Sequence, residues 1–402
     1  MKLNRRAFLA TTTAASATLG APALLRAQPT EYVFGASLPL TGPFATAGQL
    51  VAPAFGLAQR LINEEGGIAG TPIRFVTEDS GYIPANALAN YQRALATEGD
   101  AMVAYFGDST GFMKLVAPEL IGDQARLMGS TSFASELANP EVNPYQYLAG
   151  PTYEDQFDIL LRNIKDEGGS TVAFIFSNTE FGRDPLEHGK RRADELGIEV
   201  VLEEATRAQG ADIPTHVTKL AQSGAEYCIL QGYVTGVWPQ LIGGARQFGL
   251  PTKFMGTFWG MEKIIADRVT AEAGPFLDGY RGVMPYRYSY DLENAPRYQT
   301  FAAISKEMFA GTPLEHYMPT WTIQTMCAIE LAITALRMTA EKDLPLTAEN
   351  TAESLSGISD FDMGGYFGGP ITMDNNKIGT GRVYQYATDS GLFTPTSDWF
   401  TV

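Results

Sequence analysis

The stretch IRFVTEDSGYIPANALANYQRALATEGDAMVAYF, residues 73–106, carries the pattern that decides the fold. Its two ends, Ile73–Asp79 and Ala101–Phe106, are short and rich in the β-branched and aromatic residues that favour strands. Residues 85–98 between them have the length and the Ala- and Leu-rich composition of a helix. A strand, a helix and a second strand in this order indicate a parallel β-α-β unit.

The alternation of strands and helices continues on both sides of this stretch. A strand at Glu31–Leu38 and an amphipathic helix at Gln49–Glu65 precede it, and the helix meets its end signal at Gly66-Gly67. After Gly150-Pro151 the pattern starts again and runs to about Met255. Two doubly wound units in succession predict an α/β protein with two lobes.

The last third of the chain cannot complete a sheet of its own. It offers one short strand, two helices at Pro296–Phe309 and Pro319–Glu341, and a Gly- and Asn-rich tail of short β segments. We therefore expect the helices to return to the first lobe and the tail to the second, so that three crossing segments form a hinge. The predicted bounds are 1–27 for an export signal, 28–149 plus 285–346 for lobe 1, and 150–284 plus 347–402 for lobe 2.

The N-terminal residues have the pattern of an export signal. Arg5 and Arg6 precede a weakly apolar, Ala- and Thr-rich stretch, which ends at Ala27 with a small residue suited to cleavage. Paired arginines ahead of a weakly hydrophobic segment are typical of twin-arginine export. No later stretch reaches the roughly 18 uncharged apolar residues that a membrane-spanning helix requires. We therefore expect a periplasmic protein that is not inserted into the membrane.

The net charge limits the classes of partner that the protein can bind, and the two cysteines raise the question of a disulfide. The formal net charge is −16, and loss of the four cations within residues 1–27 makes it about −20. Such a charge argues against nucleic acid and anionic lipid as partners. An oxidising compartment permits a disulfide between Cys228 and Cys327, but their apolar surroundings favour two buried thiols.

The sequence contains few residue patterns that are typical of a catalytic site. His188, His216 and His316 are scattered without metal-ligand spacing, so we expect no metal and no cofactor. Residues 107–111, Gly-Asp-Ser-Thr-Gly, match the G-x-S-x-G turn of serine hydrolases. An esterase with Ser109 as nucleophile is therefore the alternative from another class. Because no oxyanion segment precedes the turn and no histidine follows a strand end convincingly, we favour a protein that binds without catalysing a reaction.

The same turn has a second interpretation as part of a ligand site. Ser109 and Thr110 follow the third strand at a helix start, and Thr131 and Ser132 follow the fourth strand. Ligands of open α/β sheets bind at the carboxyl ends of the strands. Hydroxyls and backbone N–H groups at this edge suit a ligand carboxylate, although the hydroxyls can also cap their own helices.

Five short motifs follow one another along the chain: GASLPLTGP at 35–43, INEEGGIAG at 62–70, Ser109-Thr110, Phe181-Gly182 and QFGLPTKFMG at 247–256. In this order they resemble the leucine/isoleucine/valine-binding family of periplasmic receptors for ABC transporters. The resemblance implies the type I periplasmic-binding-protein fold, in which two Rossmann-like, doubly wound lobes close on a ligand around three hinge strands. It also implies a small-molecule ligand and membrane permease subunits as partners.

The chain departs from this family at two positions that concern the ligand. In amino-acid-binding members, a hydroxyl after the fourth strand and an acidic side chain after the Met-Gly strand hold the ligand ammonium group. Phe133 and Phe258 occupy these positions here. An ammonium group buried without its carboxylate is strongly unfavourable, so the departure disfavours an α-amino acid.

Aromatic residues are frequent at the strand ends and helix starts, where they suit a flat, apolar ligand, although each can instead belong to a lobe core. With the hydroxyls they form the predicted ligand-binding set: Phe44, Ser109, Thr110, Thr131, Ser132, Phe133, Tyr153, Phe181, Tyr233, Phe258 and Trp259. The predicted ligand is an aromatic or otherwise apolar carboxylate, with branched-chain amino acids and short amides or urea as alternatives. We expect a monomer, and a sensor subunit that signals to a membrane kinase remains an alternative to a transporter component.

Overall fold

The strands of the computed structural model form two sheets. The structure describes residues 29–207, 212–232, 237–288 and 295–402, and the fold below is that of Glu31–Val402. Among these residues the first sheet is wholly parallel, in the order β2-β1-β3-β4-β5. Its strands are β1 (Tyr32–Leu38), β2 (Ile73–Asp79), β3 (Met102–Gly107), β4 (Leu127–Ser130) and β5 (Gln146–Leu148).

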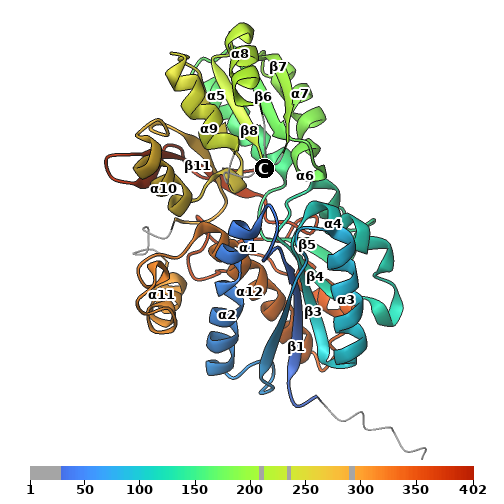
Figure 1. Cartoon of the computed structure of the whole chain (residues 1–402). Coiled ribbons are helices and arrows are strands. Elements are labelled where there is room, and N and C mark those ends of the chain that lie inside the picture. The colour runs from blue at the N-terminus through green and yellow to red at the C-terminus, as the bar shows by residue number, and fades with distance from the viewer. Residues whose placement is uncertain (1–28, 208–211, 233–236, 289–294) are drawn as a thin grey trace, which may run out of the picture. The chain divides into compact units, whose positions relative to one another are not determined.

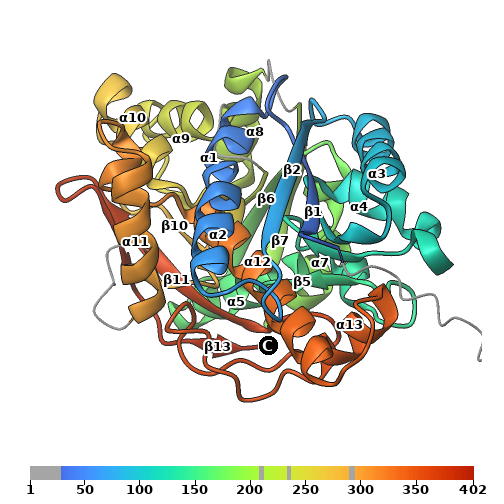
Figure 2. The same ribbon diagram turned by 90° about the horizontal axis from the view of Figure 1, so that it is seen from below.

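Helices cover both faces of the first sheet, which explains why its central strands are buried along nearly their whole length. Every residue of β3 is buried. In Figure 2, α1, α2 and α12 lie on one face of this sheet, and α3 and α4 lie on the other. The helices that pack here are α1 (Ala45–Val51), α2 (Pro53–Glu64), α3 (Pro84–Glu98), α4 (Thr110–Val116), α11 (Pro296–Met308), α12 (Thr320–Glu341) and α13 (Ala348–Ser356).

The second sheet has the order β12-β11-β10-β9-β8-β6-β7, and β13 pairs with β11. Strands β6 to β10 pair in parallel, whereas β11 and β12 add antiparallel strands at one edge. The strands are β6 (Thr171–Ser177), β7 (Glu199–Thr206), β8 (Tyr227–Gln231), β9 (Lys253–Gly256), β10 (Arg281–Met284), β11 (Thr380–Ala387), β12 (Leu392–Pro395) and β13 (Phe400–Thr401).

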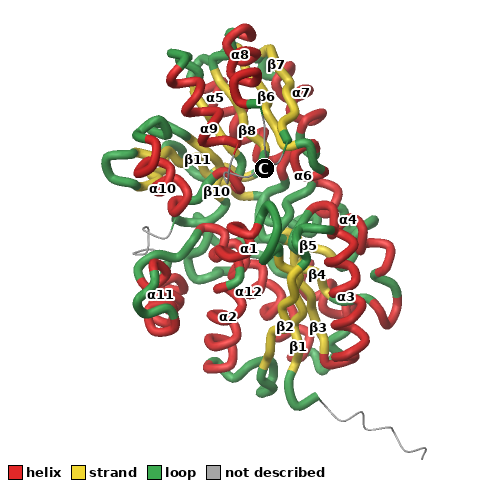
Figure 3. The backbone as a smooth tube through the Cα atoms, in the orientation of Figure 1, coloured by secondary structure: helices red, strands yellow, loops and turns green. Residues whose placement is uncertain are grey.

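The helices of this second half alternate with its strands, as the tube in Figure 3 shows. They are α5 (Tyr153–Asp166), α6 (Glu180–Arg183), α7 (Leu186–Glu195), α8 (Ile213–Ser223), α9 (Val237–Gln247) and α10 (Lys263–Ala273). Short 3-10 helices are η1 (Gly99–Ala101), η2 (Ala117–Glu119), η3 (Gly122–Gln124), η4 (Ser135–Ala138), η5 (Phe258–Gly260) and η6 (Pro313–Glu315). This alternation along both sheets confirms the predicted α/β class with two doubly wound halves.

The chain passes between the two sheets three times, after β5, after β10 and before β11. As predicted, the two late helices return to the first sheet: α11 contacts α2, and α12 contacts α1, α2 and β4. Figure 1 shows α12 close to the strands of the first sheet and α11 near α2, both far from these elements in sequence.

The segment after α12 differs from the expectation that residues from 347 onward join the second lobe. Helix α13 packs against α12, and Tyr366, Phe367 and Ile371 belong to the same hydrophobic cluster as the first sheet. Only β11, β12 and β13 join the second sheet. The lobe bounds stay a prediction, and these contacts favour placing residues 348–378 in lobe 1, because their apolar side chains bury against α12.

Both cysteines are buried free thiols, as their apolar surroundings predicted. Cys228 lies on β8 and Cys327 on α12, in different hydrophobic clusters. Burial raises the pKa of both thiols above the ordinary value, because the thiolate loses its hydration.

Candidate functional site

The predicted hydroxyls lie together at the carboxyl ends of β3 and β4. Thr110 Oγ1 and Ser132 Oγ are 2.6 Å apart and both residues are buried. Thr131 Oγ1 donates to the carbonyl oxygen of Gly107 at 3.0 Å, which ties the end of β4 to the end of β3. The parallel register that pairs Gly107 with Ser130 brings these side chains to one edge of the sheet.

Ser109 is the N-cap of α4. Its hydroxyl oxygen accepts a hydrogen bond from Phe112 N at 3.2 Å, and its φ of −159° is ordinary extended backbone. A hydrolase elbow instead holds its serine on a strained turn with the hydroxyl exposed.

The three histidines have their own carboxylate partners. His188 pairs with Asp158 at 2.9 Å, His216 with Glu204 at 2.9 Å, and His316 with its neighbour Glu315 at 3.7 Å. These contacts do not connect to Ser109, and nothing in the described geometry supports the esterase alternative.

Five of the predicted aromatic residues form one buried cluster, here called the aromatic cluster: Phe133, Tyr153, Phe181, Phe258 and Trp259, each at most 3% exposed. Ring centroids lie 5.5 Å apart for Phe133 and Phe258, and 5.0 Å apart for Tyr153 and Phe181. Trp259 Nε1 donates to the Tyr153 hydroxyl oxygen at 3.1 Å. The rings come from the segment after β4, from α6 after β6, from η5 after β9 and from the start of α5, so segments of both sheets meet here.

The aromatic cluster lies directly beside the hydroxyl-bearing residues at the ends of β3 and β4. Phe133 follows Ser132 in the chain, and a hydrogen bond with Ser132 acts to lower the pKa of Tyr153. Burial outweighs this effect and leaves the Tyr153 pKa well above its ordinary value, so the phenol stays neutral.

Phe44 and Tyr233 are the other two aromatic residues of the predicted set. Phe44 packs against Tyr82 with ring centroids 4.2 Å apart. Tyr82 has a φ of 63°, which turns the chain just after β2. Tyr233 lies outside the described residues.

Two buried carboxyl groups near this edge were not predicted. Asp108, between Gly107 and Ser109, is 5% exposed and its Oδ2 accepts the hydroxyl of Ser80. Burial raises the pKa of Asp108 to about 6. Glu262, three residues after Trp259, is fully buried, and burial raises its pKa to about 7. Asp108 directly follows β3 and Glu262 comes six residues after β9, but neither position marks the side chain as buried.

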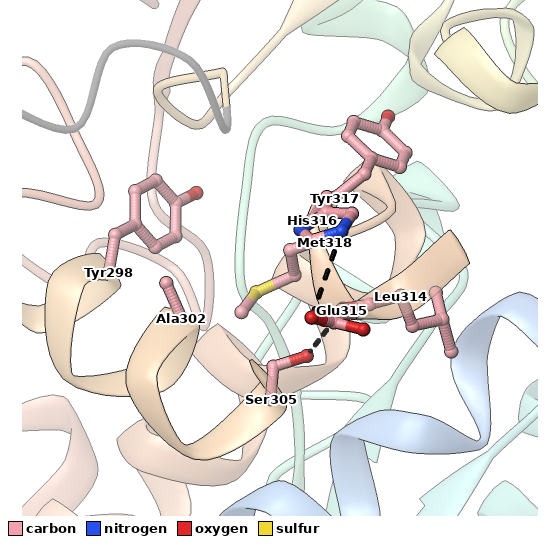
Figure 4. A pocket seen from close by; sticks show the side chains of 8 residues that line it. All are labelled: Tyr298, Ala302, Ser305, Leu314, Glu315, His316, Tyr317 and Met318. Atoms are coloured by element: carbon pink, nitrogen blue, oxygen red, sulfur yellow. Dashed lines mark hydrogen bonds and ion pairs between the residues drawn. The ribbon is translucent and has the colours of Figure 1, made fainter. Parts of the chain in front are cut away.

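Two hollows lie away from the predicted residues. One has a volume of about 70 Å³ and is lined by Tyr298, Ala302, Ser305, Leu314, Glu315, His316, Tyr317 and Met318 (Figure 4). The other is a groove of about 930 Å³ between α8, α9 and α10, with Phe276 among its lining residues. Neither hollow includes a residue of the predicted ligand-binding set.

In the part of the chain that the structure describes, no cluster of three or more His, Cys, Asp or Glu side chains could hold a metal ion. The helices there are too short or too polar to span a bilayer.

Known proteins share this architecture. A curated relative, the leucine-, isoleucine-, valine-, threonine- and alanine-binding protein of Pseudomonas aeruginosa, is 23% identical over 339 residues, 81% of this chain and 84% of that protein. The structure of a branched-chain amino acid ABC transporter from Thermus thermophilus with bound valine has a TM-score of 0.80 at 21% identity, covering 92% of this chain and 97% of that one.

A second structure has the same fold. It is a solute binding protein of an ABC transporter from Rhodopseudomonas palustris BisB5 in complex with 3,4-dihydroxybenzoic acid. Its TM-score is 0.73 at 18% identity, over 93% of this chain and 98% of that one. Residues 31–391, nearly all of the described structure, match the family model described as periplasmic binding protein. The chain therefore belongs to the periplasmic binding protein family.

Proposed function

We propose that this protein is the solute-binding component of an ABC transporter and that it captures an aromatic or otherwise apolar carboxylate. The aromatic cluster beside the Thr110–Ser132 hydroxyl pair is the observation that carries the proposal. Hydroxyl groups can donate hydrogen bonds to a ligand carboxylate, and the rings offer an apolar surface to a flat ligand body.

The origin of the rings supports a closing motion. Phe133 follows a strand of the first sheet, whereas Phe181 and Phe258 follow strands of the second. Because the rings pack on one another, a ligand can enter only when they move apart. Hinge motion between two lobes achieves this, and the ligand favours closure only through contacts that it makes better in the closed form.

The expected partners follow from the transporter role. Permease subunits of the transporter would contact the closed lobes, and we propose that the receptor acts as a monomer. Arg5 and Arg6 favour export to the periplasm by the twin-arginine pathway; retention of the precursor inside cells after both are replaced by lysine is the test.

A branched-chain amino acid is the second candidate ligand. Asp108 and Glu262 are buried carboxyl groups that could accept hydrogen bonds from a ligand ammonium group, although neither occupies the position of the acidic residue in the amino-acid-binding relatives. The relative from Thermus thermophilus binds valine, whereas the one from Rhodopseudomonas palustris binds a dihydroxybenzoic acid. Short amides and urea belong to the same set of alternatives.

Isothermal titration calorimetry on residues 28–402 separates these ligands. The panel contains benzoate, phenylacetate, leucine, valine, acetamide and urea. Heat from the aromatic carboxylates, with weak or no binding of leucine and valine, is the expected result. Binding of leucine or valine alone would replace the proposed ligand class and leave the receptor role intact.

A further inference from the structure

Three buried polar atoms near the start of α12 form no hydrogen bond of normal geometry with the described residues. They are Glu262 Oε2, Thr320 Oγ1 and Trp321 Nε1, and their residues are at most 1% exposed. Buried polar groups in folded proteins are almost always hydrogen-bonded, so each exception requires an explanation. Here the exceptions belong to consecutive or contacting residues.

All hydrogen bonds of normal geometry that Glu262 accepts through its side chain go to one of its two oxygens. Oε1 accepts the hydroxyl of Tyr317 at 2.8 Å and the backbone N–H of Ile264 at 3.3 Å, the latter as N-cap of α10. Backbone N–H groups of Thr320 and Trp321 act to lower the pKa of Glu262, which places its carboxyl beside the start of α12. Tyr317 and the N-cap bond therefore satisfy Oε1, whereas Oε2 lies beside the start of α12 without a hydrogen bond of normal geometry.

These atoms, here called the α12 polar group, border the aromatic cluster. The ring of Trp321 lies 5.3 Å from that of Trp259, whose indole N–H donates to Tyr153. The hydroxyl of Ser132 also interacts with Tyr153. The hydroxyl pair thus borders the aromatic cluster at Tyr153, and the α12 polar group borders it at Trp259.

We propose that the α12 polar group binds a hydroxyl of the ligand, at the end opposite the ligand carboxylate, so that the preferred ligands are hydroxy-substituted aromatic carboxylates. The inference rests on the proposed function and names its substrate class. A ligand hydroxyl both donates and accepts hydrogen bonds. It can donate to Glu262 Oε2 and accept from Trp321 Nε1 or the Thr320 hydroxyl, which satisfies two of the three atoms at once.

Such a site discriminates strongly. A pocket that hydrogen-bonds a ligand hydroxyl rejects the analogue without it, because the buried protein groups are then left unpaired. Calorimetry with two matched pairs, benzoate with 4-hydroxybenzoate and phenylacetate with 4-hydroxyphenylacetate, measures this preference directly. The wild-type protein should bind the hydroxylated member at least about tenfold more tightly in one of the pairs.

Variants then assign the preference to Glu262. Glu262→Gln should reduce the ratio of the two affinities at least about fivefold, and Glu262→Leu should abolish the preference. Thr320→Val should reduce it less, since one donor remains. Glu272→Gln, which changes an exposed glutamate of α10, should leave the ratio unchanged. A purely structural role of Glu262 would weaken both members of a pair equally and leave the ratio unaltered.

The possible failures are distinguishable. Equal wild-type affinity for both members of each pair, or an unaltered ratio in Glu262→Gln, overturns this inference while the proposed ligand class stands. Binding of leucine or valine without any aromatic carboxylate overturns the ligand class, and this inference with it. If the variants do not fold, as judged by circular dichroism, the wild-type ratio alone decides.

Discussion

At the scale of single residues, the Thr110–Ser132 pair gives the simplest test of the carboxylate side of the site. Thr110→Val keeps the shape of the side chain and removes the hydroxyl that lies 2.6 Å from Ser132 Oγ. Affinity for an aromatic carboxylate, measured by calorimetry, should fall about tenfold, which corresponds to about 1.4 kcal/mol. Thr97→Val, an exposed change on α3, should have no effect. Full affinity in Thr110→Val would remove the pair from the site.

The two unpredicted carboxyls show what local sequence cannot reveal at this scale. The hydroxyls and aromatic residues were predicted because strand ends are recognisable from neighbouring residues alone. Glu262 is buried through Tyr317, which lies 55 positions further along the chain, and Asp108 through Ser80, which precedes it by 28. Without the fold, an acidic residue in a loop is expected to be solvent-exposed.

At the scale of elements, the start of α4 depends on its cap. Ser109→Ala removes the side-chain acceptor for Phe112 N and should lower the free energy of unfolding by about 1 kcal/mol in urea titrations. Ser109→Asn should restore most of this stability, because asparagine caps equally well. Unfolding curves that do not change in Ser109→Ala would contradict the capping role. Affinity measured on both variants then shows whether the hydroxyl also contacts the ligand.

The positions of strands and helices were predictable where the chain is continuously buried. Which core a segment packs against was not always predictable. Strands such as β3, buried on both faces, stand out as apolar runs, and the return of α11 and α12 to the first sheet followed from counting strands. Residues 348–378 gave a weaker signal. Their glycine and asparagine turns indicated short β segments but not which core they cover, and that is decided by the packing of Tyr366 and Phe367.

At the scale of the whole molecule, the buried carboxyls make stability depend on pH. The pKa values of Asp108 and Glu262 rise to about 6 and about 7 on burial, whereas carboxyls of an unfolded chain have pKa values of about 4. Between these limits the folded state holds protons that the unfolded state has released. The contribution is therefore fully present below about pH 4 and is lost as the pH rises through 6 and 7, at about 1.4 kcal/mol per pKa unit.

Glu65 and Glu167 act in the opposite direction at lower pH. Ion pairs and hydrogen bonds with Arg297, Lys253 and Arg281 lower the pKa values of these carboxyls, so their contribution is lost only as the medium becomes strongly acidic. Thermal unfolding should accordingly show a higher midpoint at pH 5 than at pH 8. The measurement needs about 0.3 M salt, because the net charge of −16 also destabilises the fold by repulsion at high pH.

Glu262→Gln should flatten this pH dependence, since an amide does not titrate, and the exposed control Glu272→Gln should retain it. The difference between the two profiles isolates the contribution of one buried carboxyl from that of net charge. Equal midpoints at pH 5 and pH 8 in the wild-type protein would show that Asp108 and Glu262 are hydrated rather than buried in solution. In that case the Glu262 carboxyl would separate from Tyr317 and the start of α12, which border it here.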